Sequence, residues 1–284
     1  MSQLDPFPPT PPGGGSDIPP DSPLHHSSAP TARRNGGIAG AILTALAAVV
    51  AYGKYALLII FKIPALTTLV SLAISFGSYA VFWGPWYAFS LVLMILVHEM
   101  GHVVEIRRQG MQATAPVFIP FLGAAIFQRS HPTDAMKQAQ IGIAGPIAGT
   151  IGATAAFVLY GSTHSNVLLS WALIGFFINL FNLLPFGMLD GGWIMAAVSK
   201  WFQVLGLIAL AAAVFFLGLN FVAIVVILFG IPTAIERFRN DQSPYYRSVP
   251  VRARLAMAAA WLFLTGYLAV ATLAVNQLVR PFVG

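Results

Sequence analysis

The sequence has no cysteine among its 284 residues, and it has few charged side chains. The absence of cysteine excludes disulfide bonds, zinc sites built from thiolates and a cysteine nucleophile, and it says nothing about the compartment. Charged residues make up 8% of the chain and hydrophobic residues 57%. With a mean hydropathy of +0.78, this composition excludes an ordinary soluble domain and predicts a multi-pass integral membrane protein in a lipid bilayer.

The excess of basic residues does not predict a nucleic-acid partner. The formal net charge is +6, but the Lys and Arg residues flank apolar runs, where they act as orientation signals. The clusters near 107, 137, 200 and 237–254 all fall on one side of the predicted spans. The positive-inside rule makes that side the cytoplasm.

The apolar runs predict an all-α polytopic protein with about six transmembrane helices. Residues 1–37 are rich in Pro, Gly and Ser, which predicts a disordered cytoplasmic tail. In 38–62, Lys54 interrupts the apolar run, so we expect two short interfacial or half-inserted helices. Residues 63–200 form the predicted transmembrane core, in which Trp83 and Trp86 flank a tight Gly-Pro turn, and 201–284 add C-terminal transmembrane helices.

A metal-binding pattern lies inside one of these apolar runs, at Trp86 to Arg108. His98 and His102 are four residues apart, so on a helix both imidazoles lie on one face and can bind one ion. Glu99 is adjacent to His98, so it is better placed to act on a water molecule than to be a third ligand. The chemistry indicated is hydrolysis at an intramembrane Zn²⁺ site. At 1.5 Å per residue, His98 lies about 14 Å from the basic end of the helix.

A catalytic zinc site needs three protein ligands and one open position. Asp190 is the best candidate for the third ligand, because it follows a broken helix end and precedes Gly191 and Gly192, which allow a sharp backbone turn. Glu105 shares the face of His98 and His102 and stays an alternative, although a salt bridge to Arg108 also explains it.

Other polar residues have less certain roles. Asn182 lies two turns before Asp190 and could stabilise an oxyanion, while an interhelical hydrogen bond explains it, and Asn179, nearly as well. The histidines at 131 and 164 are predicted to lie in loops. Small residues in the stretch GIAGPIAG, which begins at Gly142, predict close helix packing.

Residues 114–127 are apolar but lie between basic residues, which predicts a re-entrant loop or a β-hairpin. An extended edge there could pair with an unfolded strand of a substrate. We therefore assign Pro120, Phe121 and Gly123 as candidate substrate-binding residues. A plain structural loop is the alternative.

The HEMGH motif at 98–102 and the NLLPFGMLDGG motif at 182–192 resemble those of the site-2 protease family, the intramembrane zinc metalloproteases of peptidase family M50. The stretch GPIAG at 145–149 is similar to a family motif between these two. The resemblance implies zinc bound by His98, His102 and Asp190, with Glu99 and Asn182 as catalytic residues. It also implies a single-pass transmembrane protein as substrate, such as a membrane-tethered regulator, and by analogy a bacterial cell membrane with the active site toward the cytoplasm. PDZ-like and CBS-like domains are not apparent.

Two other interpretations stay open. A membrane peptidase of the gluzincin kind takes its third ligand from a glutamate on a later helix, and Glu236 is the only later glutamate. A zinc transporter or a catalytically inactive homologue would use the same ligands to hold an ion without hydrolysis.

Overall fold

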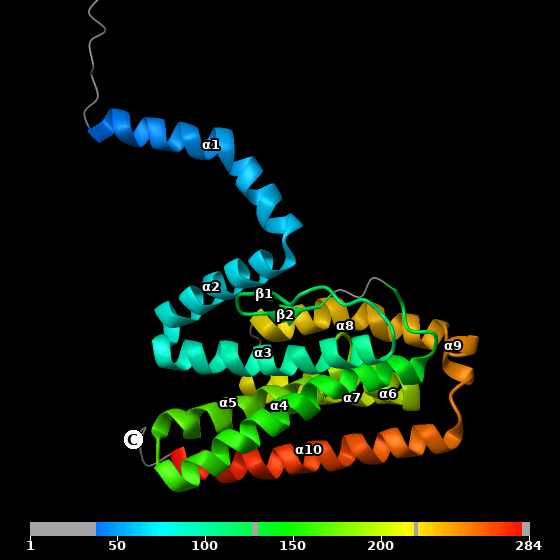
Figure 1. Ribbon diagram of the computed structural model, residues 1–284. Helices are drawn as coiled ribbons and strands as arrows, with labels where there is room; N and C mark the ends of the chain where they lie inside the picture. Colours follow the sequence, from blue (N-terminus) through cyan, green and yellow to red (C-terminus); the bar gives the residue numbers. More distant parts are fainter. Residues whose placement is uncertain (1–37, 127–129, 219–220, 280–284) are drawn as a thin grey trace, which may run out of the picture. The chain divides into compact units, whose positions relative to one another are not determined.

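The structure is a computed structural model, which describes residues 38–126, 130–218 and 221–279. The predicted disordered tail at 1–37 lies outside these residues. The chain divides into two compact units, Met1–Tyr55 and Ala56–Gly284, with the division inside the first helix. Its helices and strands, in order, are α1 Ile38–Lys62, α2 Pro64–Trp83, α3 Pro85–Arg108, β1 Val117–Ile119, β2 Gly123–Ala125, α4 Ala135–Thr163, α5 Asn166–Asn182, α6 Asp190–Val198, α7 Trp201–Leu217, α8 Phe221–Arg239, α9 Pro244–Arg247 and α10 Val251–Val279 (Figure 1).

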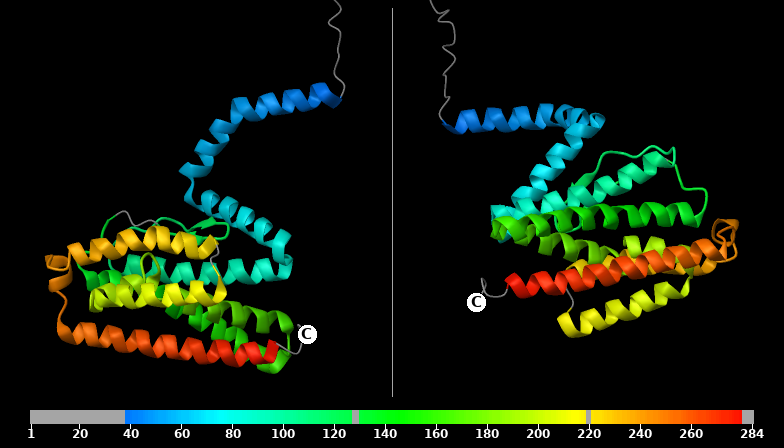
Figure 2. Two further views of the ribbon diagram at one scale, coloured as in Figure 1. Left: turned by 180° about the vertical axis from the view of Figure 1, so that it is seen from behind. Right: turned by 60° about the horizontal axis from the view of Figure 1, so that its bottom comes forward.

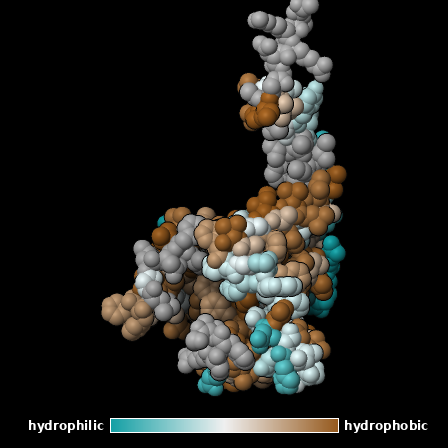
Figure 3. Space-filling model, turned by 90° about the vertical axis from the view of Figure 1, so that its left-hand side faces the viewer, coloured by the Kyte–Doolittle hydropathy of each residue, from teal (hydrophilic) through white to brown (hydrophobic). Residues whose placement is uncertain are grey.

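Four of the described helices are long and apolar enough to cross a membrane, namely α2, α3, α4 and α10. The prediction of about six spans is therefore not confirmed. Helix α5 has 17 residues, about 26 Å of helix against a hydrocarbon core of about 30 Å. It ends early because Pro185 follows closely and cannot continue a helix. The chain is nevertheless an integral membrane protein, and hydrophobic residues cover much of the surface visible in Figure 3.

Helix α1 differs from the prediction as well. Residues 38–62 form one helix, where the interrupted apolar run predicted two short ones. Proline and glycine act as predicted at the next boundary. Gly84 has a φ of 84° and donates its N–H to the carbonyl of Ala80 at the end of α2, and Pro85 begins α3. The tight Gly-Pro turn between Trp83 and Trp86 is confirmed.

Helix α4 lies at the centre of the larger unit. It packs against α3, α5 and α6. Helix α10 lies along α5 and α6 (Figures 1 and 2). The main hydrophobic core joins side chains of these helices, among them Ala139, Phe176, Ile194 and Leu268. A smaller core joins α2 and α3, and a third packs the segment between α5 and α6 against α7 and α8.

The segment 114–127 contains a small antiparallel sheet, so the β-hairpin alternative is correct. Strands β1 and β2 pair Val117 with Ala125, Phe118 with Ala124 and Ile119 with Gly123. The turn places Phe121 at a φ of 64° and Gly123 at 95°. Such positive φ values are uncommon for residues other than glycine, which marks Phe121 as a residue held by its surroundings.

Candidate metal centre

Helix α3 carries the HEMGH motif at 98–102, and the three ionisable side chains of the motif are buried. His98, Glu99 and His102 are 3%, 8% and 6% exposed. The four-residue spacing brings the two imidazoles together, and their Nε2 atoms lie 3.1 Å apart. A buried ionisable group is costly unless it has partners, so the neighbouring helices must supply them.

Asp190 is the first residue of α6 and is 7% exposed. The segment between α5 and α6 reverses at Gly187, where φ is 60°. Gly191 and Gly192 lie inside the helix and do not make the turn, which corrects the prediction. They are needed for close approach instead, since a Cβ at Gly191 would lie 2.5 Å from the carbonyl oxygen of Leu184. Gly191 thus lets α6 start directly against the end of α5, and Gly192 lets it approach the backbone of Phe186 and Gly187.

The structure brings His98, His102 and Asp190 together. One ligand atom from each lies within 4.8 Å of the others. The Nε2 of His98 is 3.0 Å from Oδ2 of Asp190, and the Nε2 of His102 is 3.4 Å from Oδ1. Two nitrogens and one carboxylate in this arrangement match the donor set of catalytic zinc sites, which leave one position open.

The hydrogen bonds around the imidazoles decide where their lone pairs point. Nδ1 of His102 lies 2.8 Å from the carbonyl oxygen of Ile141, which can only accept, so Nδ1 carries the hydrogen. Nδ1 of His98 lies 2.8 Å from Oδ1 of Asn179, whose amide nitrogen donates to the carbonyl of Gly175. With Nδ1 as the donor, the neutral form of each ring directs a lone pair from Nε2 toward the carboxylate of Asp190.

Three acceptors that face one another without a hydrogen between them repel, and a cation removes that repulsion. In addition, Oδ2 of Asp190 is a buried atom without a hydrogen-bond donor among the described residues. Ligating histidines almost always donate their other ring N–H to an oxygen acceptor, as both do here. The three residues therefore fit Zn²⁺ by their chemistry, their burial and their tautomers.

Glycines on one face of α4 make room for this centre. A Cβ on Gly145 would lie 2.9 Å from Cδ2 of His102 and closer to its Nε2, and a Cβ on Gly149 would lie 2.6 Å from Cγ of Asn179. A Cβ on Gly142 would lie 3.2 Å from the carbonyl oxygen of Asp190. The stretch GIAGPIAG does allow close packing, as predicted, and what packs against it is the centre itself.

Comparisons with known proteins find a matching family and similar proteins. The model of peptidase family M50 matches residues 86–164, which hold α3, the hairpin and α4. A zinc metalloprotease of the archaeon Methanocaldococcus jannaschii is 26% identical over 168 residues, which cover 57% of this chain and 47% of the relative. The resemblance to the site-2 protease family is confirmed. The chain spans about half the length of that curated relative.

The solved site-2 protease of Methanocaldococcus jannaschii is also similar. Its sequence is 20% identical, and the likeness covers 61% of this chain and 88% of that chain with a TM-score of 0.41. The segment matched to family M50 contains the motif histidines and the glycines of α4. Asp190 and the asparagines of α5 lie beyond its end, so their roles depend on the contacts described above.

The interhelical hydrogen bond that the sequence offered as the alternative for both asparagines is found at Asn179. Asn179 is completely buried and accepts the hydrogen bond of His98. Asn182 is the last residue of α5 and half-buried, and its side chain makes no hydrogen bond within the described part of the chain. Its assigned role at an oxyanion stays a prediction. The signal for Asn179 was available in the sequence, since an amide inside the apolar run of α5 needs a buried partner.

The two rival glutamates lie elsewhere. Glu105 accepts hydrogen bonds from Nε and Nη2 of Arg108 at 2.6 and 2.9 Å and from Gln109 at 2.8 Å. This is the salt bridge that the sequence offered as its alternative. Glu236 is exposed near the end of α8. Neither belongs to the group of ligands that the described residues form.

The hairpin residues assigned to substrate lie around its turn, against α2. The backbone N–H of Phe121 donates to the hydroxyl of Tyr79 at 3.0 Å, and its ring lies edge-on to those of Tyr79, Phe82 and Trp83. Pro120 and Gly123 flank Phe121 in the turn. These contacts fix the position of the hairpin, and the role in substrate binding stays a prediction.

Proposed function

We propose that this chain is an intramembrane zinc metalloendopeptidase that hydrolyses peptide bonds of transmembrane proteins, as in regulated intramembrane proteolysis. The observation that carries the proposal is the convergence of His98, His102 and Asp190 within 4.8 Å, buried between apolar helices. The homology to zinc metalloproteases of family M50 supports the reaction class. Bound there, Zn²⁺ would polarise the scissile carbonyl and acidify a water molecule.

The residues of the chain have distinct tasks in this proposal. Glu99 takes the proton of the attacking water and passes it to the leaving nitrogen, as a general base that becomes a general acid. Asn179 holds the ring of His98, and the carbonyl of Ile141 holds that of His102. Asn182 is the candidate donor to the oxyanion.

A peptide must be extended to be cleaved, and the hairpin offers a backbone partner. The N–H of Phe118 donates to Oγ of Ser71 on α2, so this residue directs its N–H away from β2. Its partner Ala124 therefore directs its own N–H and C=O to the opposite side of the hairpin, because paired residues of antiparallel strands share this direction. We infer that a substrate strand pairs with β2 at Ala124, next to the assigned residues Pro120, Phe121 and Gly123.

The proposed substrate is a single-pass transmembrane protein such as a membrane-tethered regulator. The proposed setting is a bacterial cell membrane with the active site toward the cytoplasm. Arg107 and Arg108 end α3, and Arg237 and Arg239 end α8. Basic residues at helix ends favour the cytoplasmic side, and this pattern supports the orientation.

Replacing Glu99 by Gln tests the proposal against a transporter or an inactive homologue. We expect E99Q to bind zinc as the unmodified protein does and to lose cleavage of a transmembrane substrate, by roughly 100-fold or more if general base catalysis is removed. The exposed Glu236 supplies the matched control, E236Q, which should cleave normally. Cleavage by E99Q at the normal rate, or zinc flux into vesicles that survives the substitution, contradicts the protease.

A further inference from the structure

Asp190 is the first residue of α6, and a single glutamine forms hydrogen bonds with the backbone on both sides of it. The N–H of Gly187 donates to Oε1 of Gln203 at 2.9 Å, and Nε2 of Gln203 donates to the carbonyl of Gly192 at 3.0 Å. Gln203 belongs to α7, so its amide ties α7 to the chain three residues before Asp190 and two residues after it.

These two hydrogen bonds use both the oxygen and the nitrogen of the Gln203 amide. The residue is 2% exposed and lies in the first turns of an otherwise apolar helix. A buried amide is unfavourable there unless both of its ends are paired. Its neighbour Gly206 packs against the same segment, since a Cβ there would lie 2.5 Å from the carbonyl oxygen of Pro185.

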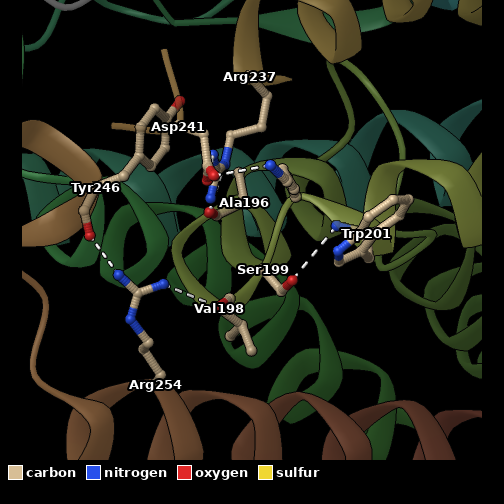
Figure 4. Close-up of polar contacts among 9 residues, drawn as sticks. Ala196, Val198, Ser199, Trp201, Arg237, Asp241, Tyr246 and Arg254 are labelled. Carbon is tan, nitrogen blue, oxygen red and sulfur yellow. Dashed lines mark hydrogen bonds and ion pairs between the residues drawn. The ribbon is translucent and has the colours of Figure 1, made fainter. Parts of the chain in front are cut away.

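The other end of α6 is held by two arginines, which Figure 4 shows. Nε of Arg237 donates to the carbonyl of Ala196 at 2.9 Å, and Nη1 of Arg254 donates to the carbonyl of Val198 at 2.9 Å. These carbonyls belong to the last turn of α6, where no intrahelical donor remains and where positive charge is favourable.

Arg237 is itself fixed in place. It is 3% exposed, it forms an ion pair with Asp241 at 2.8 Å, and its guanidinium lies 3.8 Å from the ring centre of Tyr246. The nine residues of α6 are therefore fixed at both ends by side chains from α7, α8 and α10.

We propose that Gln203 and Arg237 are positioning residues for Asp190, which they hold at the depth where its carboxylate meets the two imidazoles. The proposal rests on the zinc site of the proposed function. Because α6 has only two and a half turns, a displacement at either end moves Asp190 with the whole helix. The C-terminal helices thereby act on the centre without contributing a ligand to it.

The first test is metal affinity. Gln203→Met keeps the volume of the side chain and removes both hydrogen bonds, and we expect its affinity for Zn²⁺ to fall by about 10–100-fold, as for other residues that orient ligands. Gln242→Met changes an exposed glutamine and serves as the control. Arg237→Lys keeps the charge and loses the bond to Ala196, with the exposed Arg239→Lys as its control.

The second test needs neither metal nor substrate. The chain has no cysteine, so Met188→Cys, at an exposed position between Gly187 and Asp190, can carry a single spin label. In the metal-free protein, Gln203→Met should increase the mobility of this label, and Gln242→Met should leave it unchanged.

The outcomes separate this proposal from the protease itself. Wild-type zinc affinity together with unchanged label mobility in both Gln203→Met and Arg237→Lys overturns the positioning role. Should Gln203→Met fail to fold, Arg237→Lys decides the question by the same two measurements. If the unmodified protein binds zinc and the variants lose it, but no protein cleaves a transmembrane substrate, then positioning stands and the proposed protease fails.

Discussion

Gly145 offers the sharpest test of the metal centre, because its missing side chain is what makes room for His102. In Gly145→Ala, the new methyl would lie 2.9 Å from Cδ2 of His102 and closer still to Cε1 and Nε2. Non-bonded carbon atoms settle at about 3.5–4.0 Å, so the ring must move by at least roughly 0.6 Å. The atom nearest to the new methyl is Nε2, which the proposal assigns to the metal.

That displacement is large on the scale of a zinc site. Ligand distances in such sites hold to about 0.2 Å, so the substitution removes His102 as an effective ligand. We expect the affinity for Zn²⁺ to fall by about 100-fold or more, which corresponds to about 2.8 kcal/mol at 1.4 kcal/mol per tenfold. The assay is competition with a chromogenic chelator on detergent-purified protein, with bound metal measured independently.

Two glycines on the same helix provide controls. A Cβ at Gly161 meets nothing within 4 Å, and one at Gly152 meets only the side chain of Val97 at 3.2 Å. Gly161→Ala should therefore be neutral, and Gly152→Ala reports the cost of tighter packing away from the metal centre. Zinc affinity in Gly145→Ala equal to that of both controls would refute the argument that His102 binds the ion in the observed position.

Three further predictions follow from the contacts of the described residues. Asn179→Leu removes the acceptor for His98 and should lower zinc affinity by about 10–100-fold, measured by the same competition; full affinity would contradict the tautomer argument. Asp190→Ala should lose bound zinc in a metal analysis, and unchanged content would assign the third ligand to another residue. Hydrogen bonds from Lys200, and second from Arg237, hold the pKa of Asp241 below its usual value. The resulting stabilisation of the folded protein is present above the unfolded pKa of about 3.9 and is lost as the pH falls through the lowered folded pKa. Asp241→Asn should therefore lower the unfolding temperature at pH 7, and this difference from the unmodified protein should disappear in acid.

Local spacing explains what the sequence predicts well. His98 and His102 share a face because any helix places residues four apart together, and the turn at Gly84 and Pro85 needs only the conformational limits of those two residues. The position of the apolar segment 114–127 between basic residues similarly limits it to a loop or a hairpin. None of these predictions required knowledge of which helices touch.

Contacts between helices are what the sequence predicts poorly. Nearness to Asp190 in the chain points to Asn182, whose role at an oxyanion stays a prediction. The contact between α5 and His98 of α3 is made by Asn179. Glycine commonly makes a turn, which is why the sequence predicts one at Gly191 and Gly192. In the structure Gly191 lies where α6 approaches the carbonyls of Leu183 and Leu184, and Gly192 lies against the backbone of Phe186 and Gly187. Proximity along the chain does not determine which faces meet.

The structure also explains why a few glycines and polar residues suffice to hold an ionisable centre in an apolar protein. If each imidazole uses one nitrogen for an ion, the other nitrogen needs an acceptor, and in lipid that acceptor must come from another helix. The carbonyl of Ile141 on α4 and the amide of Asn179 on α5 meet this need only if both helices lie very close to α3. The glycines of α4 allow that approach, so close helix packing is what brings the two imidazoles and their acceptors together in this sequence.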